Sequence, residues 1–154
     1  AEGGGQRGVM QVGSMRADLL RLRILSVNDV YELENLPRFA TCVQDYKSRD
    51  AEDKCHTVVL LPGDFVAPSL LSSLDHAEGM IECLNACGVE YVCFGNHETD
   101  IPHEELKKRI KQSTFTWINT NMDINLGDIG QLPTHQVVTI RGASTGQERR
   151  VGFL

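Results

Sequence analysis

The sequence lacks any apolar run that approaches the length of a membrane span, and its N-terminus lacks the apolar core of a secretory signal. It has no G-x-G-x-x-G or Walker sequence after any apolar segment, which makes a nucleotide-binding Rossmann-type module a poor interpretation. Cys83 and Cys87 are four residues apart, unlike the two-residue gap of a zinc knuckle or redox pair. These absences argue against a membrane span, a dinucleotide cofactor and a cysteine-based metal site.

Positive charge is scarce, since 15 Lys and Arg residues stand against 21 Asp and Glu residues and give a net charge of −6. A surface that neutralises phosphates would show clustered Lys and Arg, so no nucleic-acid partner is expected. The one basic cluster, residues 107–111, follows helical spacing and is interpreted as a solvated helix face. A chain of 154 residues with 41% hydrophobic residues is long and apolar enough to form a globular core.

The five cysteines form an odd set without compact spacing. They are interpreted as small buried hydrophobic residues in a reducing compartment. Residues 1–19 are glycine-rich and polar, and we expect a flexible leader or linker there, outside the folded domain. The domain itself is expected to occupy residues 20–154.

Apolar strand patterns alternate with helical patterns along the first three quarters of the chain. Strands are predicted at residues 21–28, 56–61, 91–94 and 115–118, with the first of them central in the sheet, and helices at 36–46, 78–86 and 102–112. This β-α-β-α-β-α-β order predicts an α/β fold with a mainly parallel sheet covered by helices. After Asn121 the rhythm changes, and residues 135–141 and 150–154 predict a β-hairpin around a turn at 142–146.

The chain stops inside the apolar segment 150–154, without a polar tail. An unfinished strand leaves an open sheet edge, which natural domains seldom tolerate. Residues 20–154 are therefore expected to be the N-terminal part of a domain that continues beyond Leu154.

Polar residues end each of the first three predicted strands: Asn28-Asp29, Gly63-Asp64 and Gly95-Asn96-His97. Because parallel strands share one carboxyl edge, we expect these groups to converge, with Asp29 as a carboxylate at the end of a buried strand. Each motif alone is more typical of a turn or helix cap. Together they favour a metal site, since a divalent cation removes the repulsion between carboxylates. Oxygen and nitrogen donors of this mix suit Mn, Zn, Fe or Mg.

The three motifs, in this order, resemble the signature of the calcineurin-like metallophosphoesterase superfamily, which is D-x-H, then G-D, then G-N-H-[E/D], then later histidines. Here they read Asp29-x-Tyr31, Gly63-Asp64 and Gly95-Asn96-His97-Glu98. Residues 95–100 are also similar to the G-N-H-E-x-D signature of the 5′-nucleotidase and 2′,3′-cyclic phosphodiesterase branch, as are residues 24–29 and 80–88. The resemblance covers about residues 22–154 and implies the N-terminal half of a four-layer α-β-β-α sandwich, with the hairpin beginning the second sheet.

The resemblance implies a site with two divalent metal ions. Asp29 would bind the first ion, Asp64 would bridge both, and Asn96 would bind the second through its amide oxygen. His97 would face the substrate phosphate and stabilise or protonate the leaving group, and Asp100 would hold its imidazole in orientation. Glu98 belongs to the signature but is assigned only a hydrogen-bonding role behind the loop.

The sequence departs from the family pattern at Tyr31, which stands where the first histidine ligand is usual. Either Tyr31 coordinates as a phenolate, or the first site is vacant or loosely held, and we favour the weakened site. The later histidines of the pattern would fall beyond Leu154. The remaining histidines are interpreted as surface, capping or strand-edge residues: His56, His76, His103 and His135.

The resemblance implies a metal-dependent phosphoesterase that hydrolyses phosphate monoesters, with nucleotides as the expected substrates, by attack of an activated water. The 154-residue chain alone is expected to be inactive, because about half of the ligand set is missing. The alternative is a degenerate fold that serves as a binding or scaffold subunit, against which the intact Asn96, His97 and Asp100 argue. Relatives in this branch are often secreted or periplasmic, but the missing signal sequence and unpaired cysteines favour the cytoplasm.

Overall fold

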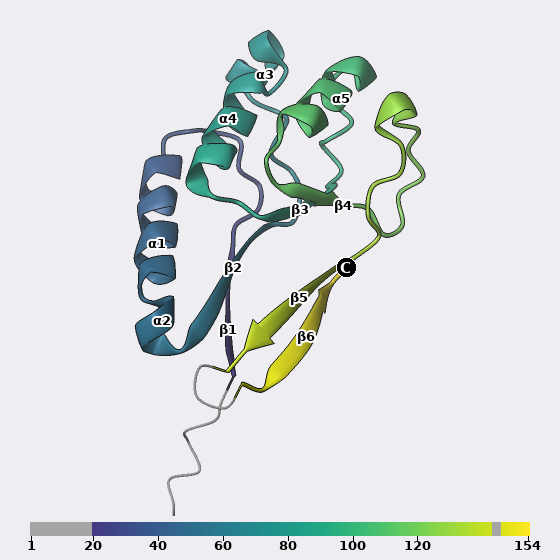
Figure 1. Ribbon diagram of the computed structural model, residues 1–154. Coiled ribbons are helices and arrows are strands. Elements are labelled where there is room, and N and C mark those ends of the chain that lie inside the picture. The colour runs from purple at the N-terminus through teal and green to yellow at the C-terminus, as the bar shows by residue number, and fades with distance from the viewer. Residues whose placement is uncertain (1–19, 143–145) are drawn as a thin grey trace, which may run out of the picture.

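The alternation of apolar strands and helices in the sequence produces a mixed α/β fold in the computed structural model, which describes residues 20–142 and 146–154 (Figure 1). Four parallel strands form one sheet in the order β1-β2-β3-β4, and an antiparallel pair, β5-β6, forms a second. The strands are β1 (Arg21–Ser26), β2 (Cys55–Leu61), β3 (Tyr91–Cys93), β4 (Thr116–Ile118), β5 (Gln136–Arg141) and β6 (Glu148–Phe153). The predicted fold class is confirmed.

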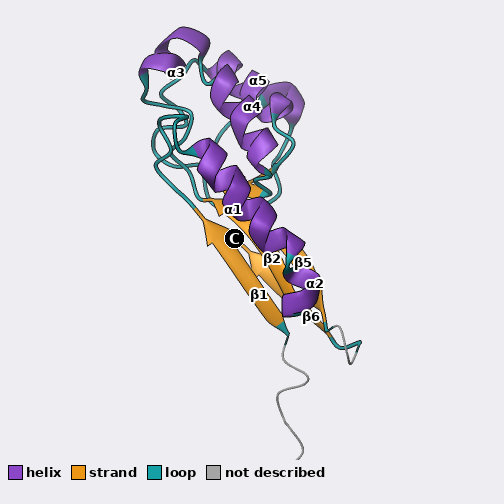
Figure 2. Cartoon of the chain, turned by 90° about the vertical axis from the view of Figure 1, so that its left-hand side faces the viewer, coloured by secondary structure: helices purple, strands orange, loops and turns teal. Residues whose placement is uncertain are grey.

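Helices connect the parallel strands and cover one face of their sheet, while the β5-β6 hairpin lies on the opposite side (Figure 2). The helices are α1 (Leu36–Ser48), α2 (Asp50–Asp53), α3 (Leu70–Asp75), α4 (Glu78–Cys87) and α5 (His103–Gln112), with a 3-10 turn, η1 (Gly127–Ile129), before the hairpin. Sequence signals explain several ends: Pro37 lies in the first turn of α1, and Gly88, at φ 76°, caps α4 in the left-handed region. None of the described helices is long and apolar enough to cross a membrane.

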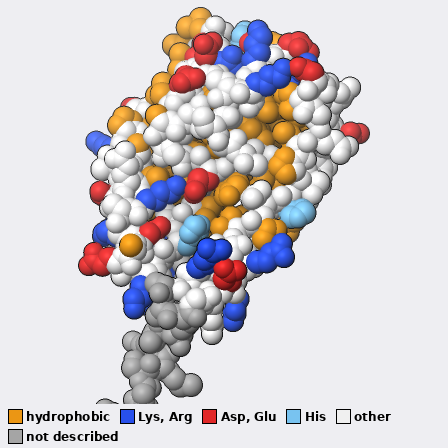
Figure 3. Space-filling model, in the orientation of Figure 1, with side chains coloured by type: hydrophobic (Ala, Val, Ile, Leu, Met, Phe, Trp, Pro, Cys, Tyr) orange, Lys and Arg blue, Asp and Glu red, His pale blue; other side chains and the backbone are white. Residues whose placement is uncertain are grey.

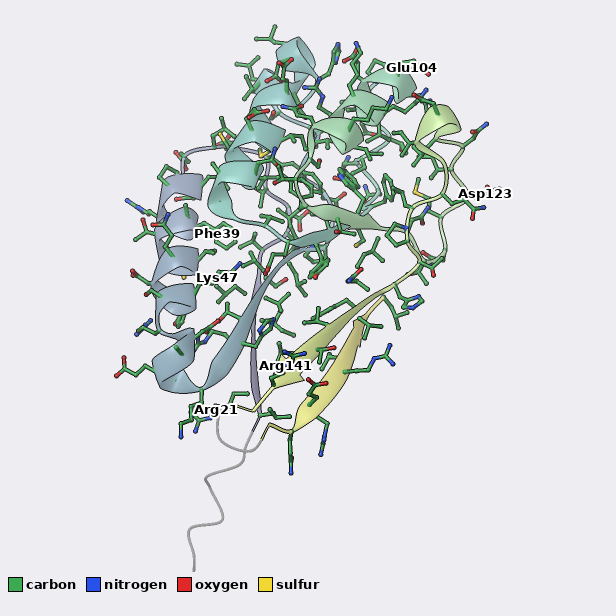
Figure 4. All side chains as sticks on the ribbon, in the orientation of Figure 1. Arg21, Phe39, Lys47, Glu104, Asp123 and Arg141 are labelled. Atoms are coloured by element: carbon green, nitrogen blue, oxygen red, sulfur yellow. The ribbon has the colours of Figure 1, made fainter. Side chains whose placement is uncertain are left out.

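The core lies between the sheet and its helices. Val59 and Leu61 of β2 and Leu84 of α4 are fully buried. Phe39 of α1 is partly buried against them and points toward the sheet (Figure 4). An aromatic cluster closes the core at β4, where the rings of Phe65 and Trp117 lie 5.2 Å apart. Burial of each such aliphatic side chain contributes about 1.5–3 kcal/mol. This packing holds the strands in place, and with them the loops at their carboxyl ends.

The first strand differs from its prediction. β1 pairs only with β2 among the described strands and is an edge strand, not a central one. Ile24 is accordingly 49% exposed. The apolar run of residues 24–27 suggested burial on both faces, but the following strands add to the sheet on one side of β1 only. The run instead packs Leu25 and Val27 against the core.

Two further expectations need correction. The cysteines are all free, but only Cys87 among them is buried and Cys42 is exposed. The basic cluster is not wholly solvated, because Arg109 is buried against α4 and lies 3.5 Å from Glu78.

Helices α2 and α3 were not predicted, since four and six residues are too short to show helical periodicity. The predicted leader at 1–19 and positions 143–145 of the predicted turn lie outside the described residues.

Candidate metal centre at the carboxyl edge of the sheet

The loops that follow β1, β2 and β3 meet at one edge of the parallel sheet. The backbone N–H of Val30 donates to the carbonyl of Asp64 at 3.0 Å, which ties the first loop to the second. The N–H of His97 donates to Oδ1 of Asp64 at 2.9 Å, which ties the third loop to the second. The structure therefore brings together the polar residues that the sequence placed at three strand ends.

Two of these loops hold a carboxylate residue in the left-handed backbone region. Asp29 has φ 54° and Asp64 has φ 60°. Asp tolerates this region better than most residues, but the conformation still costs about 1–3 kcal/mol and tends to occur at functional sites. Both aspartates therefore sit in turns whose geometry is set by the surrounding loops.

The second and third loops approach each other closely, and glycine makes the approach possible. A Cβ added to Gly63 would lie 2.5 Å from the backbone nitrogen of Gly95. A Cβ added to Gly95 would overlap Oδ1 of Asp64. The Gly-Asp and Gly-Asn-His sequences thus supply both the ligands and the space that lets the loops touch.

Asp29 is exposed, which corrects the expectation of a buried carboxylate at the end of β1. Its Oδ1 accepts a hydrogen bond from the hydroxyl of Tyr31 at 2.9 Å, and its Oδ2 accepts one from the side-chain amide of Asn28. Because β1 is an edge strand, its carboxyl end emerges into solvent rather than into the core. The carboxylate is held by its neighbours in the same loop.

Tyr31 is a neutral hydrogen-bond donor in this structure. Partial burial, followed by the hydrogen bond to Asp29, raises the pKa of Tyr31 to about 12. Its ring also meets the ring of His97 edge to face, with centroids 6.0 Å apart and an angle of 87° between the planes. The phenol thus links Asp29 to the imidazole, in the position where the family pattern has a histidine.

His97 and Asp100 form a close pair. Nδ1 of His97 lies 2.6 Å from Oδ2 of Asp100, and the N–H of Asp100 donates to the carbonyl of His97 at 3.1 Å. The hydrogen bond with Asp100 is the main reason that the pKa of His97 is raised above its ordinary value. With Nδ1 engaged in this way, Nε2 is left for another partner.

The fully buried carboxylate of the site belongs to Glu98, which is 0% exposed. Oε2 accepts from the N–H of Asp64 at 3.0 Å and from the N–H of Gly95, and Oε1 accepts from the N–H of Phe65 at 2.9 Å. The expected hydrogen-bonding role behind the loop is therefore what the structure contains. Its extent was not predictable, because the sequence does not say which loop backbone turns toward the side chain.

Two side chains at this edge keep donors of the kind that a divalent cation takes. Within residues 20–142 and 146–154, Oδ2 of Asp64 and the exposed side chain of Asn96 have no hydrogen-bond partner. They supply hard oxygen donors, of the kind that Mg and Mn prefer. The described part of the chain contains no group of three or more His, Cys, Asp or Glu side chains arranged to hold a metal ion. The candidate ligands include only two carboxylates, those of Asp29 and Asp64, and the third is the side-chain amide of Asn96.

The other histidines lie on other elements, although His76 lines a hollow that Asp100 also borders. His56 is exposed in β2, and His135 is exposed just before β5. His76 caps the end of α3, and His103 is the first residue of α5. Their placement agrees with the prediction that they are surface, capping or strand-edge residues.

A shallow apolar hollow, which the sequence did not suggest, borders the site at Tyr31. It measures about 410 Å³ and is lined chiefly by Tyr31, Leu33 and the leucines of α3. Leu70 is 82% exposed and Leu74 is 77% exposed. Figure 3 shows apolar side chains at the top of the molecule, over α3. No sequence signal for this hollow was available, because α3 itself was not predicted.

Comparison with known proteins gives three findings. The sequence model of the family described as calcineurin-like phosphoesterase matches residues 22–151. No curated protein matches significantly. Solved structures do match: the chain is similar to the calcineurin-like phosphoesterase YfkN from Bacillus subtilis, with a TM-score of 0.61 and 19% identity over 86% of this chain and 46% of that one.

Two nucleotidase structures are also similar. A 5′-nucleotidase precursor from Thermus thermophilus matches with a TM-score of 0.66 and 17% identity, covering 85% of this chain and 27% of that one. The NAD nucleotidase of Haemophilus influenzae matches with a TM-score of 0.62 and 19% identity, covering 84% and 25%. At these identities the likeness concerns the fold, and the chain spans less than half the length of each structure.

Proposed function

The chain belongs to the calcineurin-like phosphoesterase family, and we propose that it carries the N-terminal part of a metal-dependent enzyme that hydrolyses phosphate monoesters, with nucleotides as the substrate class. The observation that carries the proposal is the His97–Asp100 pair beside Asp64. The N–H of His97 donates to Oδ1 of Asp64, which leaves Oδ2 without a protein donor among the described residues. The names of the two nucleotidase structures support the choice of nucleotides.

Asp29, Asp64 and Asn96 would hold two divalent ions, of Mn, Zn, Fe or Mg, with Asp64 shared between them. When bound, such ions supply activation of a water for in-line attack and neutralisation of the phosphoryl oxygens. Because the chain spans less than half of the matched structures, we propose that the remaining ligands come from a continuation of the domain beyond Leu154.

His97 would act on the leaving group. Hydrolysis forms a bond between phosphorus and the water oxygen and breaks the bond between phosphorus and the alcohol oxygen. The departing oxygen gains a negative charge, and a protonated imidazole can donate a proton to it from Nε2. Asp100 favours the protonated imidazole by its 2.6 Å contact at Nδ1.

Tyr31 would act as a hydrogen-bond donor to Asp29 and not as a ligand. Its hydroxyl is directed at Oδ1 of Asp29, at 2.9 Å. A phenol that donates in this way keeps one carboxylate oxygen occupied, which weakens Asp29 as a metal ligand. The proposal therefore includes a first metal position of lower affinity than the second.

The same observation favours a second candidate function, a degenerate phosphoesterase fold that serves as a binding or scaffold subunit. Both oxygens of Asp29 already accept hydrogen bonds, from Tyr31 and Asn28. Intact oxygen donors at Asp64 and Asn96, beside a paired His97, favour the enzyme.

Metal content and turnover test the proposal on the full-length protein. Two equivalents of metal and Mn-dependent hydrolysis of nucleoside monophosphates are expected, and His97→Ala should lower turnover by about 10²–10⁴-fold, the usual contribution of an acid–base group. The 154-residue chain alone should show little turnover. A full-length protein with no bound metal and no turnover would support the scaffold, and normal turnover by the short chain would contradict the need for further ligands.

A further inference from the structure

The loops after β2 and β3 are joined by two carboxylates, one on each loop, and each accepts hydrogen bonds from the backbone of the other loop. Glu98, on the third loop, accepts from the N–H groups of Asp64 and Phe65 on the second loop, at 3.0 and 2.9 Å. Asp64, on the second loop, accepts from the N–H of His97 on the third, at 2.9 Å. We call this arrangement of Glu98, Asp64 and the amides that they bind the carboxylate clasp.

Glu98 is an unusual residue for a buried position. It is 0% exposed, and no Lys or Arg forms an ion pair with it among the described residues. Burial of an unpaired carboxylate is strongly unfavourable unless hydrogen bonds replace its hydration. Three backbone N–H groups, those of Asp64, Phe65 and Gly95, serve that purpose here.

The pattern of donors requires a side chain with two acceptor oxygens. Oε1 receives the N–H of Phe65, while Oε2 receives those of Asp64 and Gly95. A glutamine has the same shape but only one oxygen, so its NH₂ group would face a backbone N–H on one side. The site is therefore built for a carboxylate and not only for a polar side chain of this length.

The clasp determines how Asp64 is presented. The bond from its N–H to Glu98 holds its backbone in the left-handed region, at φ 60°. The bond from the N–H of His97 occupies Oδ1, which leaves Oδ2 without a protein donor in the described part of the chain. Because Oε2 of Glu98 also holds Gly95, the same carboxylate sets the spacing between Asp64 and the loop that carries Asn96 and His97.

We propose that Glu98 is a positioning residue for the candidate metal centre, which sets the orientation of Asp64 and its spacing from Asn96 through the carboxylate clasp. This inference rests on the proposed function, because it treats Asp64 and Asn96 as metal ligands. Loss of a group that orients a metal ligand commonly lowers metal affinity by about 10–100-fold. Glu98 would do so without touching metal or substrate.

Glu90 provides a matched control. Its Oε2 accepts the backbone N–H of Val59 at 2.8 Å, so it too joins a carboxylate to the backbone of the β2 region. It precedes β3, whereas Glu98 follows β3, so the two contacts lie at opposite ends of that strand. Nζ of Lys47, which lies on α1 (Figure 4), approaches Oε1 of Glu90 at 3.3 Å, so this carboxylate has an ion-pair partner outside the candidate centre.

The test compares Glu98→Gln and Glu90→Gln in the full-length protein by two measurements. Titration with Mn²⁺, followed by the electron paramagnetic resonance signal of the free ion, gives the affinity. Proton–nitrogen correlation spectra in EDTA follow the backbone amides of Asp64, Gly95 and Val30 without metal. We expect Glu98→Gln to weaken Mn²⁺ binding by about 10–100-fold and Glu90→Gln to leave it unchanged.

The amide of Val30 separates positioning from a local effect at Glu98, because it donates to the carbonyl of Asp64 at 3.0 Å and lies far from Glu98 in the sequence. If Glu98 positions Asp64, the Val30 amide shifts in Glu98→Gln together with those of Asp64 and Gly95. Unchanged Mn²⁺ affinity, or a Val30 amide that stays in place, would overturn the proposal. If the unmodified full-length protein binds no Mn²⁺, the proposed function fails and the Val30 amide alone decides the clasp. Should Glu98→Gln not fold, Glu98→Asp replaces it. We expect this variant to lose only part of the Mn²⁺ affinity, because the charge remains although the side chain is shorter.

Discussion

His97 and Asp100 are joined twice, by a contact of 2.6 Å between Nδ1 and Oδ2 and by the bond of 3.1 Å from the N–H of Asp100 to the carbonyl of His97. The second bond closes a turn that keeps the carboxylate beside the imidazole even though Asp100 is an exposed residue. A ring held in this way presents Nε2 in one direction. The pair therefore determines both the charge and the orientation of the imidazole.

Replacing Asp100 should lower the pKa of His97. Because the hydrogen bond with Asp100 is the first cause of the raised pKa, we expect Asp100→Asn to move it toward the ordinary value of about 6.5. The measurement is a titration of the His97 ring protons by NMR in EDTA. In the full-length protein, the fall in activity on the alkaline side of the pH profile should occur at a lower pH in Asp100→Asn. An unchanged His97 titration would show that the pair does not control the charge.

The same pair makes a pH-dependent contribution to stability. A group whose pKa is raised on folding stabilises the folded state fully below its unfolded pKa, and this contribution disappears as the pH rises through the folded pKa. The difference in unfolding free energy between the unmodified chain and Asp100→Asn should therefore be largest below about pH 6 and decrease above it. Urea unfolding at several pH values measures it, and a difference that grows with pH would contradict the assignment.

Buried and exposed leucines should differ sharply in their effect on stability. Leu84 of α4 is 0% exposed, so Leu84→Ala should lower the free energy of unfolding by about 2–5 kcal/mol. Leu74 of α3 is 77% exposed, and Leu74→Ser should change it by no more than about 0.5 kcal/mol. Urea denaturation of both variants provides the check. A large loss in Leu74→Ser would mean that the apolar surface of α3 is covered in solution.

The parallel sheet and the meeting of three strand ends were predictable because each depends on a local pattern. Apolar strands ending in polar loops determine which residues emerge at the carboxyl edge, whatever the packing behind them. Gly88 was correctly predicted as the end of α4 for the same reason, since a left-handed cap depends on one residue.

Features that depend on neighbours distant in sequence were not predictable. The run before Asp29 suggested burial, but the exposure of Asp29 follows from the position of β1 at the sheet edge. Glu98 is buried because the N–H groups of Asp64 and Phe65, more than thirty residues earlier, turn toward it. Neither fact can be derived from the residue type or from spacing along the chain.

The close approach of the second and third loops should make Gly95 intolerant of substitution. A Cβ there would overlap Oδ1 of Asp64, so Gly95→Ala must displace a candidate ligand or separate the loops. We expect a loss of about 1–3 kcal/mol in unfolding free energy, as for overpacking elsewhere, and weaker Mn²⁺ binding. Gly152 in β6 is the control, because an added Cβ meets nothing within 4 Å. Urea denaturation and Mn²⁺ titration should leave Gly152→Ala close to the unmodified chain, and equal losses in both variants would contradict a specific contact.

Two substitutions at Tyr31 distinguish a ligand from a hydrogen-bond donor. Tyr31→Phe removes the hydroxyl that donates to Asp29 at 2.9 Å but keeps the ring that meets His97 at 6.0 Å. If the phenol only occupies an oxygen of Asp29, metal affinity should stay level or rise slightly in this variant. If the oxygen of Tyr31 coordinated metal as a phenolate, affinity should fall by tenfold or more, roughly the loss of one ligand interaction worth about 1.4 kcal/mol.

Tyr31→His introduces a nitrogen donor at the position where the family pattern has one. Since Tyr31 is neutral, with a pKa raised to about 12, and directed at Asp29, we expect the histidine to increase Mn²⁺ affinity by about tenfold and to raise activity of the full-length enzyme. Equilibrium dialysis gives the metal stoichiometry, and Tyr31→Phe serves as the control for loss of the hydroxyl. Decreased activity in both variants would assign Tyr31 a direct contribution to the reaction. Gain in Tyr31→His alone would locate the weakened metal position at Asp29.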